Sequence, residues 1–250
     1  MPPEPTFLSL DWPLPRGVRA AISTRQGGSS RVPWNSFNLA DHVGDDSAAV
    51  AANRQLLRQC LDLPREPLWL QQVHGTEIAQ WEVEAGFGRA PQADGAVARS
   101  PGAVLSILTA DCLPVLAVSR DGQVIAAFHA GWRGLAAGVL EAGIRAMQVA
   151  PDEILLYLGP AIGAQRYVVG AEVRAAFLAH SPQAELAFRP QGDGYLADLY
   201  LLARQRLAAL GVTAIWGGEH CTHSEEQLFF SYRRDGQSGR MASLIWREEA

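Results

Sequence analysis

Three short segments constrain the fold of this chain most, because each carries a potential metal ligand or nucleophile within a predicted turn. They are the segment at 72–76 with His74, the segment at 109–114 with Cys112, and the segment at 129–134 with His129. Cys112 follows His74 by 38 positions, and His129 follows Cys112 by 17. Such separations exclude a finger-type zinc knuckle. The three side chains can therefore meet only if the fold brings distant segments together.

Two imidazoles and one thiol can fill three positions of a tetrahedral zinc ion, and the fourth stays open for water or substrate. Bonds of about 2.0–2.3 Å would then hold the ligand atoms within roughly 4 Å of one another. Each residue also has a simpler interpretation. His129 could be a core histidine, Cys112 a buried inert thiol, and His74 a solvated turn residue. The neighbouring Asp111 weakens the interpretation of Cys112 as an inert thiol, because a carboxylate in an apolar run requires a partner.

A second group of metal-binding residue types lies at 219–223, with His220, Cys221 and His223. Adjacent residues of an extended segment point to opposite faces, so His220 and Cys221 cannot easily share one ion. We therefore expect Cys221 to line the site and the two histidines to be solvated.

Several residues could bind an anion or a substrate. Arg133 follows His129 at the predicted start of a helix, where free backbone N–H groups favour phosphate or carboxylate. Arg25 and Asn38 lie in polar, glycine-rich loops, which could carry substrate contacts or be plain surface turns. Two further arginines, Arg233 and Arg234, follow an aromatic run and could pack on the site or simply end a strand.

Composition restricts the class of protein. Hydrophobic residues make up 48% of the 250 residues and charged residues 19%, which disfavours disorder, and the length fits one large domain or two small ones. The formal net charge of −5 disfavours nucleic-acid binding but allows small anionic ligands. Three scattered cysteines argue against a disulfide framework, and we expect neither a signal peptide nor a membrane span. We therefore expect a cytoplasmic globular protein.

Strand-like runs alternate with single helices, which favours the α+β class with mixed sheets over a doubly wound parallel fold. No glycine-rich dinucleotide motif or P-loop follows a strand. Asp121-Gly122 predicts a two-residue hairpin turn. Helices are expected at 48–60, 135–149, 171–179 and 198–210, and strands at 18–23, 68–73, 77–82, 103–108, 114–119, 123–129, 154–158, 213–216, 228–231 and 242–246.

The ordered motifs of the chain resemble the YfiH family, also called the multicopper polyphenol oxidase or laccase-like family. The resemblance extends from about Thr24 to Trp246. The motifs that carry it are Thr24-Arg25-x-Gly27-Gly28, Phe37-Asn38-Leu39, His42-Val43-Gly44-Asp45, Asn53-Arg54, Gln72-Val73-His74-Gly75, Ala93-Asp94-Gly95, Thr109-Ala110-Asp111-Cys112-Leu113-Pro114, His129-Ala130-Gly131-Trp132-Arg133-Gly134, Gly159-Pro160-x-Ile162-Gly163, Tyr167-x-Val169-Gly170, Cys221-Thr222 and Phe229-Phe230-Ser231-Tyr232-Arg233-Arg234.

This resemblance implies one domain over residues 1–250, with mixed β-sheets packed together and helices outside, related in shape to cysteine-hydrolase toxins. It also implies that His74, Cys112 and His129 are zinc ligands and catalytic residues. The implied activities are phosphorolysis of adenosine, inosine, guanosine and methylthioadenosine, with purine nucleosides and phosphate as ligands, and hydrolytic deamination of adenosine.

Other enzyme classes stay open. In one, Cys112 is the nucleophile of an amidase or hydrolase acting on a peptidoglycan precursor, and His129 or His74 is its base. Copper-dependent polyphenol oxidation fits less well, because laccase chemistry needs several coppers and more than the six histidines present. A metal-binding or nucleoside-binding module without catalysis is the remaining hypothesis.

Overall fold

A six-stranded mixed sheet forms the centre of the molecule. The computed structural model describes residues 3–82 and 90–249. In spatial order its strands are β11 (Ala214–Gly217), β7 (Ile154–Leu158), β5 (Leu113–Ser119), β6 (Ile125–Ala130), β3 (Gly95–Ala98) and β2 (Ile78–Trp81). Two pairs of neighbouring strands, β11–β7 and β3–β2, are parallel, and the other three pairs are antiparallel.

A second, antiparallel sheet packs against the first. Its order is β1 (Val18–Ile22), β12 (Met241–Arg247) and β4 (Val104–Thr109). Side chains alternate between the two faces of each strand, so Leu116 and Val118 of β5 meet Leu105 and Ile107 of β4 between the sheets. Because both of its faces are covered, β5 is buried along its whole length.

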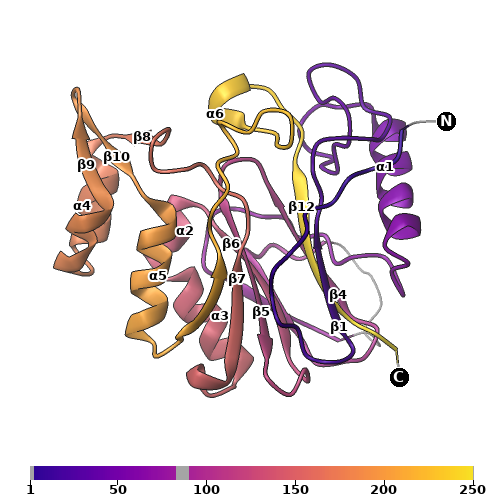
Figure 1. The fold of residues 1–250 in the computed structure, drawn as a ribbon, viewed down its shortest axis with the longest axis horizontal. Helices are drawn as coiled ribbons and strands as arrows, with labels where there is room; N and C mark the ends of the chain where they lie inside the picture. The colour runs from indigo at the N-terminus through magenta and orange to yellow at the C-terminus, as the bar shows by residue number, and fades with distance from the viewer. Residues whose placement is uncertain (1–2, 83–89, 250) are drawn as a thin grey trace.

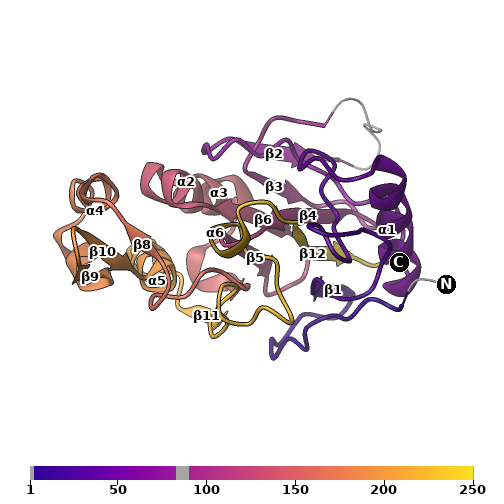
Figure 2. The ribbon, with the colours of Figure 1, turned by 90° about the horizontal axis from the view of Figure 1, so that it is seen from above.

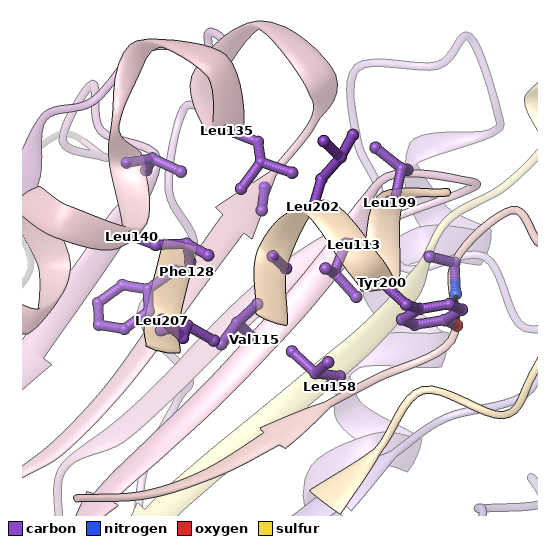
Figure 3. Packing of buried hydrophobic residues seen from close by; sticks show 14 of the residues in the cluster. Leu113, Val115, Phe128, Leu135, Leu140, Leu158, Leu199, Tyr200, Leu202 and Leu207 are labelled. Atoms are coloured by element: carbon purple, nitrogen blue, oxygen red, sulfur yellow. Dashed lines mark hydrogen bonds between the residues drawn. The ribbon is translucent and has the colours of Figure 1, made fainter. Parts of the chain in front are cut away.

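Helices cover the two outer faces of the paired sheets (Figure 1). On the six-stranded sheet lie α2 (Trp132–Ala137), α3 (Val139–Met147) and α5 (Leu199–Ala209). Figure 3 shows the packing of Leu140 of α3 and Leu207 of α5 around Phe128 of β6. On the outer face of the second sheet, α1 (Ser47–Cys60) packs through Leu57. The layers are therefore helix, sheet, sheet and helix, and the expected α+β class with mixed sheets is confirmed.

The remaining elements lie at the periphery. A small antiparallel sheet of β8 (Val168–Val169), β10 (Gly194–Ala197) and β9 (Phe188–Gln191) lies beside α4 (Ala171–Leu178). The short α6 (Tyr232–Asp235) lies above the central strands in Figure 2. In the described part of the chain, 3-10 helices cover Pro151–Glu153 and Pro182–Ala187.

Most of the helix predictions are correct. The helices predicted at 48–60, 171–179 and 198–210 are α1, α4 and α5, and Asp198 caps α5 by accepting a hydrogen bond from the backbone N–H of Leu201 at 2.9 Å. The single helix predicted at 135–149 is wrong. Gly138 adopts φ +100° and ends α2 there, so that α3 starts in a new direction.

Some of the strand predictions are wrong. Residues 68–73 make only isolated bridges, because Gln72 bonds the backbone of Leu108 through its side chain instead of continuing a ladder. Residues 228–231 form a loop anchored by the fully buried rings of Phe229 and Phe230. The hairpin between β5 and β6 exists, but residues 120–124 form its loop instead of a two-residue turn. Strands β3, β8, β9 and β10 were not predicted.

None of the helices in the described part of the chain is long and apolar enough to cross a membrane.

Candidate metal centre and anion-binding cavity

The fold brings His74, Cys112 and His129 together. Each offers one ligand atom, and the three atoms all lie within 4.8 Å of one another. The rings of the two histidines are 4.7 Å apart between centroids. The limit of 4.8 Å between ligand atoms is wider than the roughly 4 Å that bonds to one tetrahedral ion require. Small side-chain movements would therefore complete the coordination. Two nitrogen ligands and one thiolate suit zinc and other ions that prefer mixed nitrogen and sulfur coordination.

Unusual backbone conformations allow this approach. His74 has φ +60° in its turn, and Asp111, next to Cys112, has φ +87°. These left-handed conformations are uncommon outside glycine and point to turns that the surrounding structure holds in place. A side chain at Gly131 would begin 2.5 Å from Nδ1 of His74 and 3.1 Å from Sγ of Cys112. Glycine is therefore required at this position for the two ligands to approach.

Asp94 orients the histidines, although we did not single it out as a site residue. It is completely buried, directly before β3, and its Oδ1 lies 2.8 Å from both Nδ1 of His129 and the backbone nitrogen of His74. Its Oδ2 accepts from the backbone N–H of Gly75 at 2.6 Å. A carboxylate that binds the far nitrogen of a metal-ligating histidine fixes the ring and leaves Nε2 for the ion. The only signal in the sequence was the Ala93-Asp94-Gly95 motif, which does not reveal its partner.

The charges of this group are coupled. Burial lowers the pKa of His129, but the electrostatic interaction with Cys112 and the hydrogen bond to Asp94 outweigh it and raise the pKa to about 9. Burial, together with the positive charge of His129, lowers the pKa of His74. Burial raises the pKa of Asp94, yet the hydrogen bonds from His129 and the backbone lower it overall. Without a metal, the raised pKa favours the imidazolium form of His129 between Asp94 and Cys112.

A cavity of about 500 Å³ opens in front of the three ligands. Three guanidinium groups face it, and each lies over a different aromatic ring: Arg133 over Trp132 at 4.5 Å, Arg233 over Tyr167 at 5.0 Å, and Arg240 over Tyr232 at 5.7 Å. The described residues that line the cavity include no Asp or Glu. A cavity of this kind, in a chain of net charge −5, attracts anions.

A smaller cavity of about 120 Å³ adjoins the first beside Cys112. Trp132, Tyr167 and Tyr232 line both cavities, whereas Ile162 and Leu199 line only the smaller one. A polar, basic space and a mostly apolar, aromatic space thus meet at the proposed ligands. This combination can accept a ligand that has an anionic part and a flat apolar part.

The predicted substrate contacts divide into two groups. Arg133 lines the cavity as predicted. Arg25 instead lines a separate cavity of about 550 Å³, where it bonds the carbonyl of Asn35 at 3.0 Å. Asn38 is completely buried, and its amide bonds Asp45 and the neighbouring backbone. Neither Arg25 nor Asn38 is among the described residues that line the cavity of the His/Cys/His group.

The second histidine and cysteine cluster lies elsewhere. Sγ of Cys221 accepts from the backbone N–H of Gly163 at 3.2 Å, and Nδ1 of His220 lies 2.9 Å from a carboxylate oxygen of Glu225. Cys221 is not among the described residues that line the cavity of the His/Cys/His group. His220 has Glu225 as a partner instead of being merely solvated. Of the two arginines after the aromatic run, Arg233 faces the cavity, while Arg234 bonds surrounding carbonyls.

Fold and site together define an α+β protein with a His/Cys/His group capable of holding a metal ion at the edge of a basic cavity. The model of the family described as multi-copper polyphenol oxidoreductase laccase matches residues 19–248, and the chain belongs to this family. The predicted resemblance to the YfiH family is thereby confirmed.

Curated relatives extend over nearly the whole chain. The purine nucleoside phosphorylase YfiH of Escherichia coli strain K12 is 50% identical over 235 residues, which cover 94% of this chain and 96% of that protein. The relative in Pseudomonas aeruginosa named purine nucleoside phosphorylase PA4543 is 49% identical, covering 97% of this chain and 99% of its own.

Solved structures agree with the fold. The crystal structure of the Neisseria meningitidis protein NMB0706 has a TM-score of 0.92 and 47% identity, covering 97% of this chain and 99% of that chain. The structure of YlmD from Geobacillus stearothermophilus has a TM-score of 0.86 and 34% identity, covering 94% and 93%.

Proposed function

We propose that this protein is a zinc-dependent purine nucleoside phosphorylase, with zinc held by His74, Cys112 and His129. The observation that carries the proposal is the juxtaposition of this ligand group with three guanidinium groups in one cavity that has an adjoining aromatic space. The names of the relatives in Escherichia coli and Pseudomonas aeruginosa support the same activity. Substrates in this proposal are adenosine, inosine, guanosine and methylthioadenosine, together with inorganic phosphate.

In phosphorolysis, a phosphate oxygen forms a bond to C1′ of the ribose while the bond from C1′ to the purine nitrogen breaks. The electron pair of the broken bond goes to the purine, which takes up a proton. Arg133, Arg233 and Arg240 hold the phosphate dianion, since guanidinium groups bind its oxygens through paired N–H donors. The anion then lies beside the cationic ribose that develops, and the rings of Trp132 and Tyr167 flank the leaving purine.

His74, Cys112 and His129 would hold the zinc, which would supply Lewis-acid chemistry and lower the pKa of water to about 7, as hydrolytic deamination of adenosine requires. Asp94 keeps the ring of His129 oriented and compensates the positive charge near it. A hydrolase activity beside the glycosyltransferase activity is therefore part of the proposal. The three free cysteines support a reducing compartment, which we take to be the cytoplasm.

One observation favours a second candidate. The pairing of His129 with Cys112 resembles the Cys–His pair of a cysteine hydrolase, which would act on an amide such as that of a peptidoglycan precursor. Polyphenol oxidation has less support, because the described residues contain one His/Cys group and a multicopper centre needs several.

Chelation and alkylation separate the two candidates. For the phosphorylase, a strong zinc chelator should abolish nucleoside turnover, added zinc should restore it, and bound zinc should protect Cys112 from iodoacetamide. For the cysteine hydrolase, chelation should leave amidase activity intact and alkylation should abolish it. Full nucleoside turnover after verified metal removal would refute the zinc proposal.

A further inference from the structure

Arg240 differs from the other two arginines of the cavity in how firmly it is held. Its Nη1 donates to the carbonyl oxygens of Ser238 at 2.8 Å and Gly239 at 3.0 Å, and its guanidinium lies over the ring of Tyr232. It forms no ion pair with a carboxylate of the described residues, unlike Arg206 and Arg54. Burial is the largest cause of its lowered pKa. A partly buried guanidinium without a carboxylate partner is ready to bind an anionic ligand.

The backbone of Arg240 is fixed by Asn38 from a distant part of the sequence. The backbone N–H of Arg240 donates to Oδ1 of Asn38 at 3.0 Å, and the carbonyl of Arg240 accepts from Leu39 at 3.3 Å. A side chain at Gly239 would begin 2.8 Å from Cβ of Asn38. The segment that carries Arg240 therefore packs closely along Asn38.

The amide of Asn38 is itself held by a buried polar network. Its Nδ2 donates to Oδ2 of Asp45 at 2.9 Å, and the same carboxylate oxygen accepts from the hydroxyl of Ser30 at 2.6 Å. Asn53 of α1, which is completely buried, donates to Ser30 at 2.9 Å and to the carbonyl of Asn38 at 2.9 Å. Hydrogen bonds of this kind rigidify a buried site when every member has a partner. The network connects α1 to the cavity through Arg240.

We propose that Arg240 is the principal guanidinium that binds the phosphate co-substrate, and that Asn38 is its positioning residue. The assignment of the anion as a co-substrate rests on the proposed function. The guanidinium of Arg133 lies over a ring but makes no hydrogen bond to the described residues. The guanidinium of Arg233 donates to one carbonyl, that of Val168, and the backbone N–H of Arg233 donates to Asp111. Arg240 is anchored at its guanidinium, its N–H and its carbonyl, so it loses the least freedom when an anion binds. Asn38 thus acts through Arg240 and does not touch the substrate.

Steady-state kinetics with inosine and phosphate test both assignments. Arg240→Gln should raise the KM for phosphate about 10-fold to 100-fold, as expected for loss of a charge-assisted hydrogen bond, and leave the KM for inosine within about twofold. Asn38→Ala should raise the KM for phosphate in the same direction. In the double variant, the effect of Asn38→Ala should largely disappear, because Arg240 is no longer there to be positioned.

Ser106→Ala is the matched control. Ser106 is buried in β4, which pairs with β12, the strand that begins directly after Arg240. It donates to the carbonyl of Leu68 at 2.7 Å and has no hydrogen bond to Arg240. Its loss should lower stability without changing the KM for phosphate. Asp45→Asn keeps size and folding while it weakens the anchor of Asn38, so it provides a second test if Asn38→Ala does not fold. A phosphate KM that is unchanged in Asp45→Asn and in any folded Asn38→Ala protein would overturn the role of Asn38.

Direct titration of inorganic phosphate into the zinc-loaded protein separates this inference from the proposed function. Phosphate binding that is lost in Arg240→Gln and weakened in Arg240→Lys supports the assignment of Arg240 even if no nucleoside is turned over, and in that case only the proposed function fails. If Arg240→Gln binds phosphate as tightly as the unmodified protein does, the assignment of Arg240 is overturned, whatever the enzyme does with nucleosides.

Discussion

At the scale of single residues, side-chain chemistry suggested the candidate ligands but not the residues that orient them. His74, Cys112 and His129 are side chains with strong intrinsic ligand chemistry, each beside a turn residue, so a sequence can suggest them. Asp94 and Arg240 derive their importance from distant partners. Asp94 bonds His74, 20 positions away in the sequence, and Arg240 bonds Asn38, 202 positions away. Such pairings depend on the fold and have no local pattern.

Replacing Asp94 by Asn should weaken metal binding while the protein stays folded. The amide removes the negative charge beside His129 and presents an N–H group where two oxygens now accept hydrogen bonds. We expect zinc affinity to fall about 10-fold to 100-fold, measured by competition with a chromophoric chelator. Asp193→Asn, at an exposed position, should bind zinc like the unmodified protein. Equal affinities in the two variants would contradict the orienting role of Asp94.

The raised pKa of His129 also makes the stability of the metal-free protein depend on pH. A histidine whose pKa rises from about 6.5 in the unfolded chain to about 9 in the folded one stabilises the folded state fully below about pH 6.5. This contribution is lost as pH rises through about 9. Urea unfolding of chelator-treated protein between pH 6 and 10 should show the decline, and His129→Gln should remove most of it. A stability that increases over this range would contradict the charged state assigned to His129.

At the scale of elements, long and regular segments were predictable and irregular ones were not. Strands β5 and β6 are continuous apolar runs, and helices α1 and α5 each begin at a capping aspartate. The helix predicted at 135–149 failed because one left-handed glycine, Gly138, interrupts an otherwise continuous apolar pattern. Residues 228–231 have the composition of a strand, yet the buried rings of this segment hold a loop. In both cases tertiary packing decides between two local conformations that the sequence permits.

The entry into α2 should tolerate no side chain. Gly131→Ala would place Cβ 2.5 Å from Nδ1 of His74, so the imidazole must move away from Cys112. We expect stability to fall by roughly 1–3 kcal/mol from overpacking, and zinc binding to be lost. Gly17→Ala has open space around Cβ but φ +77°, and it should cost roughly 1–2 kcal/mol with zinc binding intact. Thermal unfolding and zinc titration of both variants measure the difference.

At the scale of the whole molecule, the two sheets share one interior. Side chains of β5 and β6 contribute alternately to the cluster under the helices and to the cluster between the sheets. We therefore expect residues 1–250 to unfold as one domain in a single cooperative transition, with coincident curves from calorimetry, far-UV circular dichroism and tryptophan fluorescence. Two separated transitions would show that the sheets are independent units.

The central claim, phosphorolysis at a metal-dependent site, is tested most directly by phosphorus NMR of the zinc-loaded protein with inosine and inorganic phosphate. Phosphorolysis at this site predicts that the phosphate signal decreases as a ribose 1-phosphate signal appears, in equal amount to the hypoxanthine released. It also predicts that both changes stop when the zinc is chelated and resume when zinc is restored. Release of hypoxanthine without ribose 1-phosphate, or an undiminished rate in verified metal-free protein, would contradict it.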